Sequence, residues 1–570
     1  MVKNEVFDGI VSEIGANGEG IVKNGNSVVF VPLCLPGEKI RYKILKVKKN
    51  IAFGKIEEIY TPADERERAM CPVFGKCGGC QLQHIKYREQ LKIKSKTLKD
   101  CLHKIAFIDY DVPLTQKSDL KYEYRNKLQL PIRNTVKGDK IGFFAENTHR
   151  IVPITACSLH GAWAQKVISA VMEFIENYNV SCFNEETGQG VLKHLVVKQI
   201  DGKIMIILVI TQDELPYCNK LTQILNNYFA DYTLYLNINK LNNNVILSNN
   251  FRLITGKPFL TAQDFGITYE VGPASFMQVN DNVRHKLYIA VRKFAQLDEN
   301  TVVIDAYSGT GLMSAILAQK AKNVIGIEII KEATESANEL AETNKLSDKM
   351  QNICAPCEEV LPKIISDIKN NGEKCVLVLD PPRKGIEYNI IQSIRQALPE
   401  RVIYVSCSPQ SLARDLGLLL GTLKYEGNEI KKTGTIDDVY EIEYCRPYDM
   451  FAQTKQLETL VVLSKKSVSH ISIDVEFGEG EGQISLKQIK ERAEERKPKK
   501  KVTYKDIQAY VEENYGFKVH TAYIAEVKRD LGLPMYDAPN AVEELKRPRS
   551  HPTAEMVEAI KDALKHFGII

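Results

Sequence analysis

"TVVIDAYSGTGLMSAILAQKAKNVIGIE", residues 301–328, has the pattern of a buried strand, a glycine loop, a short helix and a second buried strand. Both strands are rich in Val and Ile, as is usual for strands that are covered on both faces. The same alternation of apolar strands and amphipathic helices extends from about residue 271 to residue 465. Strands that are separated by helices of this length predict a doubly wound, mainly parallel, Rossmann-like α/β sheet.

The loop after the first of these strands has residues suited to a nucleoside cofactor. Gly309 and Gly311 allow the backbone to approach a ligand, and the next strand ends at Glu328, a carboxylate that can accept both ribose hydroxyls. Ser314 occupies the place of the third glycine of a dinucleotide-binding motif. With Asp305 at the end of the first strand, this pattern favours S-adenosylmethionine over NAD. The alternative is that Asp305 and Glu328 only cap helices.

Two later strands end in reactive or charged side chains. Asp380 follows a strand in "VLVLDPPRKGIE", and Cys407 follows another in "VIYVSCSPQSLARDL". Ligands of parallel sheets bind at the carboxyl ends of the strands, so both residues are expected at the same edge as Asp305. A helix begins directly after Cys407, and its dipole is expected to lower the thiol pKa, which predicts a nucleophile. The alternatives are a purely structural Pro-Pro turn and a cysteine that fills the core.

Glu458 begins the last strand of this region, "ETLVVLSKK". If that strand runs antiparallel at the edge of the sheet, its first residue lies at the carboxyl ends of the parallel strands, near Cys407. A nucleophile, a base and a methyl donor would then share one place. The alternative is an exposed acidic residue at the start of a strand.

The sequence predicts a multidomain α/β protein with four regions. Residues 1–60 contain short strands between glycine turns and predict an OB-type β-barrel, which commonly binds single-stranded nucleic acid. Residues 61–270 are first cysteine-rich and then alternate strands and helices, which predicts a central α/β domain. Residues 271–465 form the predicted cofactor-binding domain. Residues 466–570 predict a strand ("HISIDVEFGEG") and a mainly helical extension with a capping box at Thr503 and Asp506. A helix-turn-helix is possible there, but two helices and a turn are common.

The cysteine-rich segment predicts a metal site. In "CPVFGKCGGCQLQH" the residues Cys71, Cys77 and Cys80 have the spacing Cys-x5-Cys-x2-Cys. A tetrahedral thiolate site needs a fourth ligand, and Cys157 in "ITACSLH" is the best candidate because it follows a predicted strand end. The spacing does not separate zinc from an iron–sulphur cluster, and core filling is the remaining alternative.

The composition is that of a globular protein, with 570 residues, 44% apolar and 26% charged. The N-terminal "MVKNEVFDGI" lacks the apolar core of a signal peptide, and apolar runs such as "IMIILVI" (residues 204–210) are too short to cross a bilayer. We therefore expect a cytoplasmic protein with no membrane partner. Its 13 cysteines are expected to be reduced.

The net charge of +4 is distributed unevenly. Lys39–Lys55 contains seven Lys or Arg residues and no acidic residue, and Lys487–Lys501 contains eight basic against three acidic residues. Such basic stripes suit the phosphates of a nucleic acid. The alternative is that they are ordinary solvated faces.

With these motifs in order, residues 1–465 resemble the RNA uracil-5-methyltransferases, which act on ribosomal RNA or tRNA. The resemblance rests on "CPVFGKCGGC", "ASFMQVN", "DAYSGTGLMS", "VLDPPRKG", "SCSPQSLARDL" and "MFAQTKQLETLVVL". Residues 1–60 resemble the family's TRAM domain, which ribosomal members often have and the tRNA enzyme usually lacks. The resemblance therefore implies 23S rRNA as the RNA partner, with tRNA as the alternative. No obligate protein partner is evident.

The resemblance also implies roles for individual residues. It implies a [4Fe-4S] cluster on Cys71, Cys77, Cys80 and Cys157, S-adenosylmethionine contacts from Gln278, Tyr307, Glu328 and Asp380, Cys407 as the nucleophile, and Glu458 as the general base. The stretch "KKTGTIDDVYEIEY" lengthens the usual spacing between Cys407 and Glu458. The implied reaction is methylation of carbon 5 of uridine through a covalent bond between Cys407 and carbon 6.

Two other classes of function stay open at this point. One is a non-catalytic RNA-binding protein with a zinc or iron–sulphur knuckle, which leaves Asp305, Glu328, Asp380 and Cys407 unexplained. The other is an iron–sulphur oxidoreductase with a nucleotide cofactor.

Overall fold

The chain forms two compact units in the computed structural model, Met1–Ser469 and His470–Ile570. The structure describes residues 1–466, except 16, 147, 242, 428, 434 and 436–438, and residues 503–531, 533, 551–567 and 569. The predicted strand "HISIDVEFGEG" and the basic stripe Lys487–Lys501 lie outside the described residues. Every helix in the described part of the chain is too short or too polar to span a lipid bilayer.

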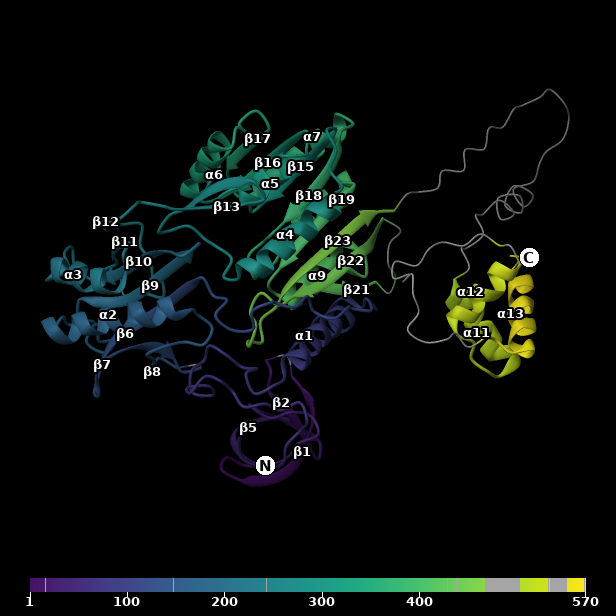
Figure 1. The fold of residues 1–570 in the computed structure, drawn as a ribbon, viewed down its shortest axis with the longest axis horizontal. Coiled ribbons are helices and arrows are strands. Elements are labelled where there is room, and N and C mark those ends of the chain that lie inside the picture. Colours follow the sequence, from purple (N-terminus) through teal and green to yellow (C-terminus); the bar gives the residue numbers. More distant parts are fainter. Residues whose placement is uncertain are drawn as a thin grey trace. The chain divides into compact units, whose positions relative to one another are not determined.

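The N-terminal residues form a closed five-stranded barrel in the order β1-β2-β3-β5-β4, which confirms the predicted barrel (Figure 1). Alternate apolar side chains such as Val22, Val29 and Tyr42 point inward and are buried. A Cβ atom at Gly20 would lie 2.5 Å from the Cys34 sulphur, so the barrel requires glycine there. The strands are β1 (Val6–Ile14), β2 (Gly20–Asn24), β3 (Ser27–Val31), β4 (Lys39–Lys48) and β5 (Ile51–Thr61).

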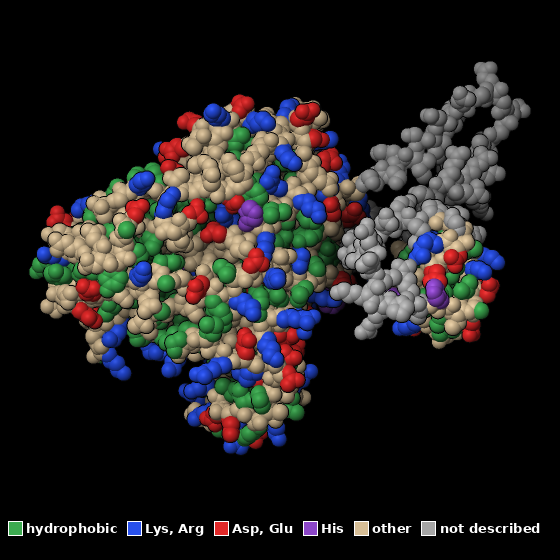
Figure 2. Space-filling model, viewed as in Figure 1, with side chains coloured by type: hydrophobic (Ala, Val, Ile, Leu, Met, Phe, Trp, Pro, Cys, Tyr) green, Lys and Arg blue, Asp and Glu red, His purple; other side chains and the backbone are tan. Residues whose placement is uncertain are grey.

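The basic stripe Lys39–Lys55 lies on β4 and on the first residues of β5. Arg41 forms an ion pair with Asp8 at 3.0 Å, and Figure 2 shows Lys and Arg side chains among acidic ones on the visible face of the barrel. The stripe is therefore basic in sequence but shares its surface with carboxylates.

A helix and a seven-stranded sheet follow the barrel. The sheet order is β12-β11-β10-β9-β6-β7-β8, and helices α2 and α3 pack their apolar side chains on one face of it (Figure 1). The elements are α1 (Tyr87–Cys101), a π-helical turn (Leu102–Ala106), β6 (Lys127–Thr135), β7 (Gly138–Phe144), β8 (Ile151–Pro153), α2 (Ala162–Tyr178), β9 (Leu192–Ile200), β10 (Lys203–Ile210), α3 (Cys218–Tyr228), β11 (Thr233–Ile238) and β12 (Phe251–Thr255). A hairpin of β13 (Leu260–Asp264) and β14 (Ile267–Val271) leads to the next sheet.

The predicted doubly wound sheet is present. Its order is β17-β16-β15-β18-β19-β23-β22, with parallel pairing from β17 to β19 and antiparallel pairing of β23 and β22. Side chains of α4, α5 and α6 fill one face, and those of α7, α8 and α9 fill the other. The elements are α4 (Asp281–Ala295), β15 (Thr301–Ala306), α5 (Leu312–Ala318), β16 (Asn323–Glu328), α6 (Lys331–Thr343), β17 (Met350–Cys354), α7 (Cys357–Asn370), β18 (Lys374–Leu379), α8 (Tyr388–Ala397), β19 (Arg401–Ser406), α9 (Pro409–Leu419), β20 (Leu423–Glu426), β21 (Glu429–Lys432), β22 (Tyr440–Tyr448) and β23 (Glu458–Lys465).

Two details of this sheet differ from the prediction. The strand that begins with Glu458, β23, is antiparallel as expected, but it is not the edge strand, because β22 pairs with its outer side. The stretch "KKTGTIDDVYEIEY" supplies the first residues of β22, whose alternating polar residues are typical of an exposed edge. This stretch therefore contributes to the sheet through β22.

The second unit contains three described helices, α11 (Tyr504–Tyr515), α12 (Thr521–Asp530) and α13 (Ala554–His566). Their apolar side chains, including Val511, Ile524 and Ile560, form a separate core. The capping box predicted at Thr503 and Asp506 is present.

Candidate functional site

The glycine loop makes a tight connection from β15 to α5. Tyr307 has the left-handed φ of 65°, and Gly309 and Gly311 have φ values of 56° and 79°. A Cβ atom at Gly311 would lie 2.8 Å from the Cβ atom of Ala337 on α6. Glycine is therefore needed at Gly311 for both its conformation and its close contact with a neighbouring helix.

The carboxylate of Glu328 closes this loop from the next strand. Its Oε2 atom accepts the Gly309 N–H at 3.0 Å and its Oε1 atom accepts the Ile330 N–H at 2.9 Å. Each carboxylate oxygen has a second acceptor position, so Glu328 is still able to accept ribose hydroxyls.

Asp305 has a more structural environment. Its buried carboxylate accepts the Ser314 hydroxyl at 2.6 Å, at the start of α5. Burial raises the pKa of Asp305 to about 6, and the charge of Glu328 adds to this increase. These contacts fit the alternative interpretation of Asp305 as a carboxylate that holds a helix.

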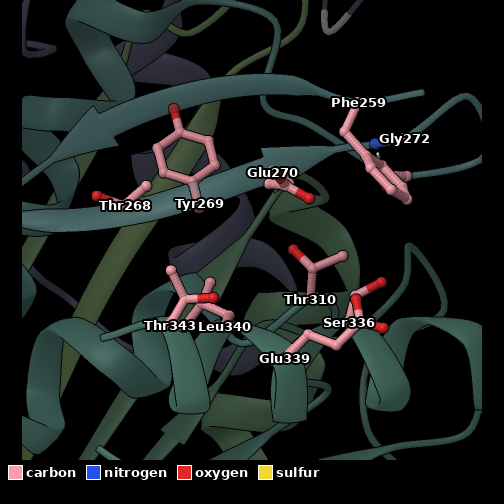
Figure 3. Close-up of a pocket in the computed structure, with 11 residues that line it drawn as sticks. Phe259, Thr268, Tyr269, Glu270, Gly272, Thr310, Ser336, Glu339, Leu340 and Thr343 are labelled. Carbon is pink, nitrogen blue, oxygen red and sulfur yellow. Dashed lines mark hydrogen bonds between the residues drawn. The ribbon is translucent and has the colours of Figure 1, made fainter. Parts of the chain in front are cut away.

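A pocket borders the glycine loop on the side of the β13–β14 hairpin. Figure 3 shows Thr310 of the loop and Glu339 of α6 on one side, and Tyr269 and Phe259 on the other. The pocket also reaches Gly272 and Ser275, which come shortly before Gln278. The pocket therefore lies between the glycine loop and the segment before Gln278, the two segments that the sequence assigns to the cofactor.

The segment before Gln278 is held by buried polar side chains of the central sheet. The ammonium group of Lys198 donates to the carbonyl oxygens of Gly272 and Ser275, both at 2.7 Å. Burial lowers the pKa of Lys198 to about 7. The Asn126 amide donates to the Gln278 carbonyl oxygen at 2.9 Å. The segment that ends at Gln278 is thereby held by a residue of β9 and by the residue directly before β6, both outside its own domain.

Asp380 and Arg383 lie in the turn after β18. The buried carboxylate of Asp415 shapes this turn by accepting the Ile386 N–H at 3.0 Å and the Tyr404 hydroxyl at 2.7 Å. A Cβ atom at Gly385, where φ is 81°, would lie 2.3 Å from the same carboxylate. The Ser411 hydroxyl of α9 donates to the Arg383 carbonyl oxygen at 2.9 Å.

Cys407 and Glu458 are neighbours across two strands. Ser406, the last residue of β19, pairs with Thr459 of β23, so Cys407 follows at the end where β23 begins with Glu458, close enough for the Glu458 charge to raise the pKa of Cys407. Cys407 is partly buried, and Glu458 is only 3% exposed. The structure therefore brings both residues to the carboxyl ends of the parallel strands, and their catalytic roles stay a prediction.

The charges around Cys407 oppose the predicted lowering of its pKa. Burial raises the pKa of Cys407, and the negative charges of Glu458 and Asp380 add to the increase. Ser408, rather than Cys407, caps α9 and accepts the Ser411 N–H, so the thiol lies one residue before the helix cap. The direction is therefore the opposite of the predicted one, because burial and two carboxylates raise the pKa of Cys407.

Glu458 has a similarly raised pKa. Burial raises the pKa of Glu458 well above its usual range, and the charge of Asp380 adds to the increase. Burial raises the pKa of Asp380, and the charge of Asp305 adds to the increase. A continuous group of interacting charges thus connects Glu458 to the glycine loop.

Arg383 is a site residue that the sequence analysis did not single out. Its side chain lowers the pKa of Cys407, and its positive charge lowers the pKa of Glu458. The signal was present in "VLDPPRKG", which places an arginine in the same turn as Asp380.

The four predicted metal-binding cysteines line one cavity. Its lining includes Cys71, Cys77, Cys80, Cys157, Arg125 and His160. Burial raises the pKa of Cys80 to about 12 and that of Cys157 to about 11, whereas the charge of Arg125 lowers both. In the described parts of the chain, no three His, Cys, Asp or Glu side chains converge closely enough to hold a metal ion. The metal site therefore stays a prediction.

Comparisons with known proteins agree with this arrangement. The model of the family described as tRNA (uracil-5-)-methyltransferase matches residues 86–466. An uncharacterized RNA methyltransferase of Clostridium tetani is 36% identical over 469 residues, which cover 81% of this chain and 97% of the relative. A Bacillus cereus protein with the same description is 34% identical over 473 residues, covering 81% and 97% of the two chains.

A solved structure matches most of the chain. It is the tRNA (uracil-54, C5)-methyltransferase of Pyrococcus abyssi in complex with S-adenosyl-L-homocysteine. The TM-score is 0.62 at 25% identity, and the match covers 80% of this chain and 99% of that one. Because the family model ends at residue 466, the unit His470–Ile570 lies beyond the matched region.

Proposed function

Since this chain belongs to the tRNA (uracil-5-)-methyltransferase family and is an S-adenosylmethionine-dependent RNA methyltransferase, we propose that it methylates carbon 5 of a uridine through a covalent bond to Cys407. The observation that carries the proposal is the pairing of Ser406 with Thr459, which sets Cys407 beside Glu458. A thiol and a buried carboxylate side by side are the two groups that this reaction needs from the protein.

The proposed cofactor residues are Gln278, Tyr307, Glu328 and Asp380. The closed loop at Gly309 and Glu328 supports this assignment, because it leaves carboxylate acceptor positions for a ribose. The Pyrococcus relative was solved with S-adenosyl-L-homocysteine, the demethylated form of the cofactor. When bound, S-adenosylmethionine supplies an electrophilic methyl group.

The protein's part in the reaction follows from Cys407, Arg383 and Glu458. Arg383 favours the thiolate of Cys407, which adds to carbon 6 of uracil and makes carbon 5 nucleophilic. After carbon 5 has taken the methyl group, the carboxylate of Glu458 removes the proton from carbon 5. The bond between carbon 6 and sulphur then breaks, which restores the ring and the thiolate. A carboxylate with a raised pKa is a stronger base, which suits this step.

We propose a [4Fe-4S] cluster on Cys71, Cys77, Cys80 and Cys157. All four thiols line one cavity, and the partly buried Arg125 contributes positive charge beside it. A single zinc ion needs its sulphur ligands about 2.3 Å from one point, whereas a cluster accommodates cysteines spread around a larger centre. The residues present therefore fit a cluster better than one ion. When bound, it would supply a rigid link between the cysteines.

The proposed domains are an RNA-binding TRAM barrel (1–60), a central RNA-binding domain (61–270), a catalytic domain (271–465) and an extension of unassigned role (466–570). We propose 23S rRNA as the substrate, with tRNA as the alternative. The barrel alone does not distinguish 23S rRNA from tRNA as the substrate. The match to the tRNA enzyme covers 80% of this chain, which is too much for the match to leave out the barrel. In either RNA the target base must leave its stack to reach Cys407.

The test is methyl transfer from radiolabelled S-adenosylmethionine by the purified full chain. The substrates are unmodified 23S rRNA and unmodified tRNA, and the product is mapped as 5-methyluridine. Labelling of 23S rRNA is expected, and labelling of tRNA alone selects the alternative. If neither RNA gains 5-methyluridine although the protein binds both, the proposal is wrong and the RNA-binding alternative is favoured.

A further inference from the structure

The loop that leads to Glu458 is hydrogen bonded to the cysteine-rich segment. We call residues 449–457 the base loop and residues 71–80 the cysteine loop. The N–H groups of Gln81 and Leu82, directly after the cysteine loop, both donate to the Gln453 carbonyl oxygen, at 3.2 and 3.1 Å. One carbonyl oxygen of the base loop thus holds two N–H groups from a distant part of the chain.

The side chain of Gln81 completes this connection. Its Oε1 atom accepts the Lys455 N–H at 3.3 Å, and its Nε2 atom donates to the Gly78 carbonyl oxygen at 2.9 Å. Gly78 lies between Cys77 and Cys80. One amide group therefore bridges the cysteine loop and the base loop, three residues before Glu458.

The base loop has a conformation that needs such support. Gln453 is fully buried and has a left-handed φ of 68°, which costs a non-glycine residue about 1 kcal/mol or more unless its surroundings hold it. The Gln90 side chain of α1 donates to the Gln453 side-chain oxygen at 2.9 Å. The contacts that hold Gln453 thus come from residues 81–90, next to the cysteines.

We propose that Gln81 is a positioning residue, through which the cysteine loop holds Glu458 in place for removal of the proton from carbon 5. The inference rests on the proposed role of Glu458. It gives the cysteine segment a function beyond binding RNA, because loosening of the segment at Gly78 would impair the last step of the reaction. Disturbing the bridge should then slow elimination more than addition, and the covalent RNA adduct should accumulate.

Gln81→Leu tests the bridge, because leucine has similar size and neither donates nor accepts. In the full chain we expect turnover to fall about tenfold, with a covalent enzyme–RNA band on a denaturing gel. Bound iron per chain and RNA affinity should match those of the parent protein. Gln81→Glu keeps the acceptor for the Lys455 N–H but loses the donor to the Gly78 carbonyl oxygen, so it also breaks the bridge and should accumulate the adduct.

Gln83→Leu is the matched control. The Gln83 side chain accepts the Cys71 N–H at 3.1 Å and donates to the Ser158 hydroxyl at 3.4 Å, so it supports the cysteine cavity from another side. We expect this variant to bind iron less tightly. When the two variants are compared at equal iron content, only Gln81→Leu should give the adduct band.

Glu458→Gln separates failure of the inference from failure of the proposed function. If Glu458→Gln yields no adduct, the proposed role of Glu458 is wrong. If Glu458→Gln traps the adduct while Gln81→Leu turns over normally, or loses activity without adduct, the positioning role of Gln81 is overturned. Should Gln81→Leu fail to fold, Gln81→Glu decides, because low turnover without adduct in that variant also overturns the inference.

Discussion

Ser406 and Thr459 form a register pair between β19 and β23, and this pair sets Cys407 beside Glu458. A slip of one residue in this register would turn the side chains of β23 to the opposite face. Both faces of β23 are apolar, with Val461 and Leu463 in one core and Leu460 and Val462 in the other, so such a slip would exchange side chains of different shape between two close-packed cores.

Replacement of Cys407 by alanine is expected to abolish methyl transfer, because no other group adds to carbon 6. RNA affinity should stay within about twofold of the parent, since phosphate contacts dominate it. Radiolabel transfer and filter binding measure the two properties. Measurable 5-methyluridine formation by Cys407→Ala would exclude the covalent mechanism.

Replacement of Glu458 by alanine should trap the enzyme on its substrate. Addition and methyl transfer can still occur, but the proton on carbon 5 is not removed, so the sulphur is not expelled. A slower-migrating band that carries both protein and labelled RNA is expected on a denaturing gel. Full turnover by this variant would assign the base to another residue.

The rate should rise with pH across the neutral range. Cys407 and Glu458 must both lose a proton, and both have raised pKa values, so the active forms appear only as the pH exceeds these values. Arg383 lowers both pKa values, so Arg383→Gln should shift the rising limb to higher pH. We expect a loss of about tenfold at pH 7, for a pKa rise of about one unit.

The control for this profile is Lys384→Gln. Lys384 is the next residue and is paired with Glu387 at 2.6 Å on the surface. Its replacement should leave the pH profile unchanged. A profile for Arg383→Gln that coincides with the parent's would show that Arg383 does not tune the two groups.

Lys94→Met is expected to lower the free energy of unfolding by about 3–5 kcal/mol. The Lys94 ammonium and the Asp449 carboxylate lie 2.5 Å apart, both almost completely buried, so the change leaves an unpaired buried charge. Urea unfolding measures the difference. Lys96→Met removes an exposed pair with Asp100 and should cost less than about 1 kcal/mol. Equal losses in the two variants would contradict this assignment.

Cys157→Ser is expected to lower the iron and inorganic sulphide bound per chain, because it removes one of four thiols around the cavity. Visible absorbance and metal analysis measure the loss. Cys218→Ser, a change on α3 in the same sheet domain, is the control and should keep the parent's iron content. Equal iron in both variants would remove Cys157 from the predicted ligand set.

Much of the fold could be read from local patterns. The glycine turns and alternating apolar residues of β1–β5 predicted the barrel, and the Val-rich runs of β15, β18 and β19 predicted the parallel sheet. These patterns work because side-chain alternation and glycine conformations depend on neighbouring residues. The edge strand β22 was missed because its polar pattern resembles that of a loop, and only pairing with β23 makes it a strand.

The sequence by itself determined which chemical groups this protein has and on which strands and loops they occur, since those follow from residue identity and short-range periodicity. Tertiary structure alone decided that Cys407 meets Glu458, that burial raises the pKa of the thiol against the helix dipole, and that Gln81 touches the loop of Gln453. Register, burial and contacts between distant segments depend on how the whole chain packs, and no local pattern specifies them.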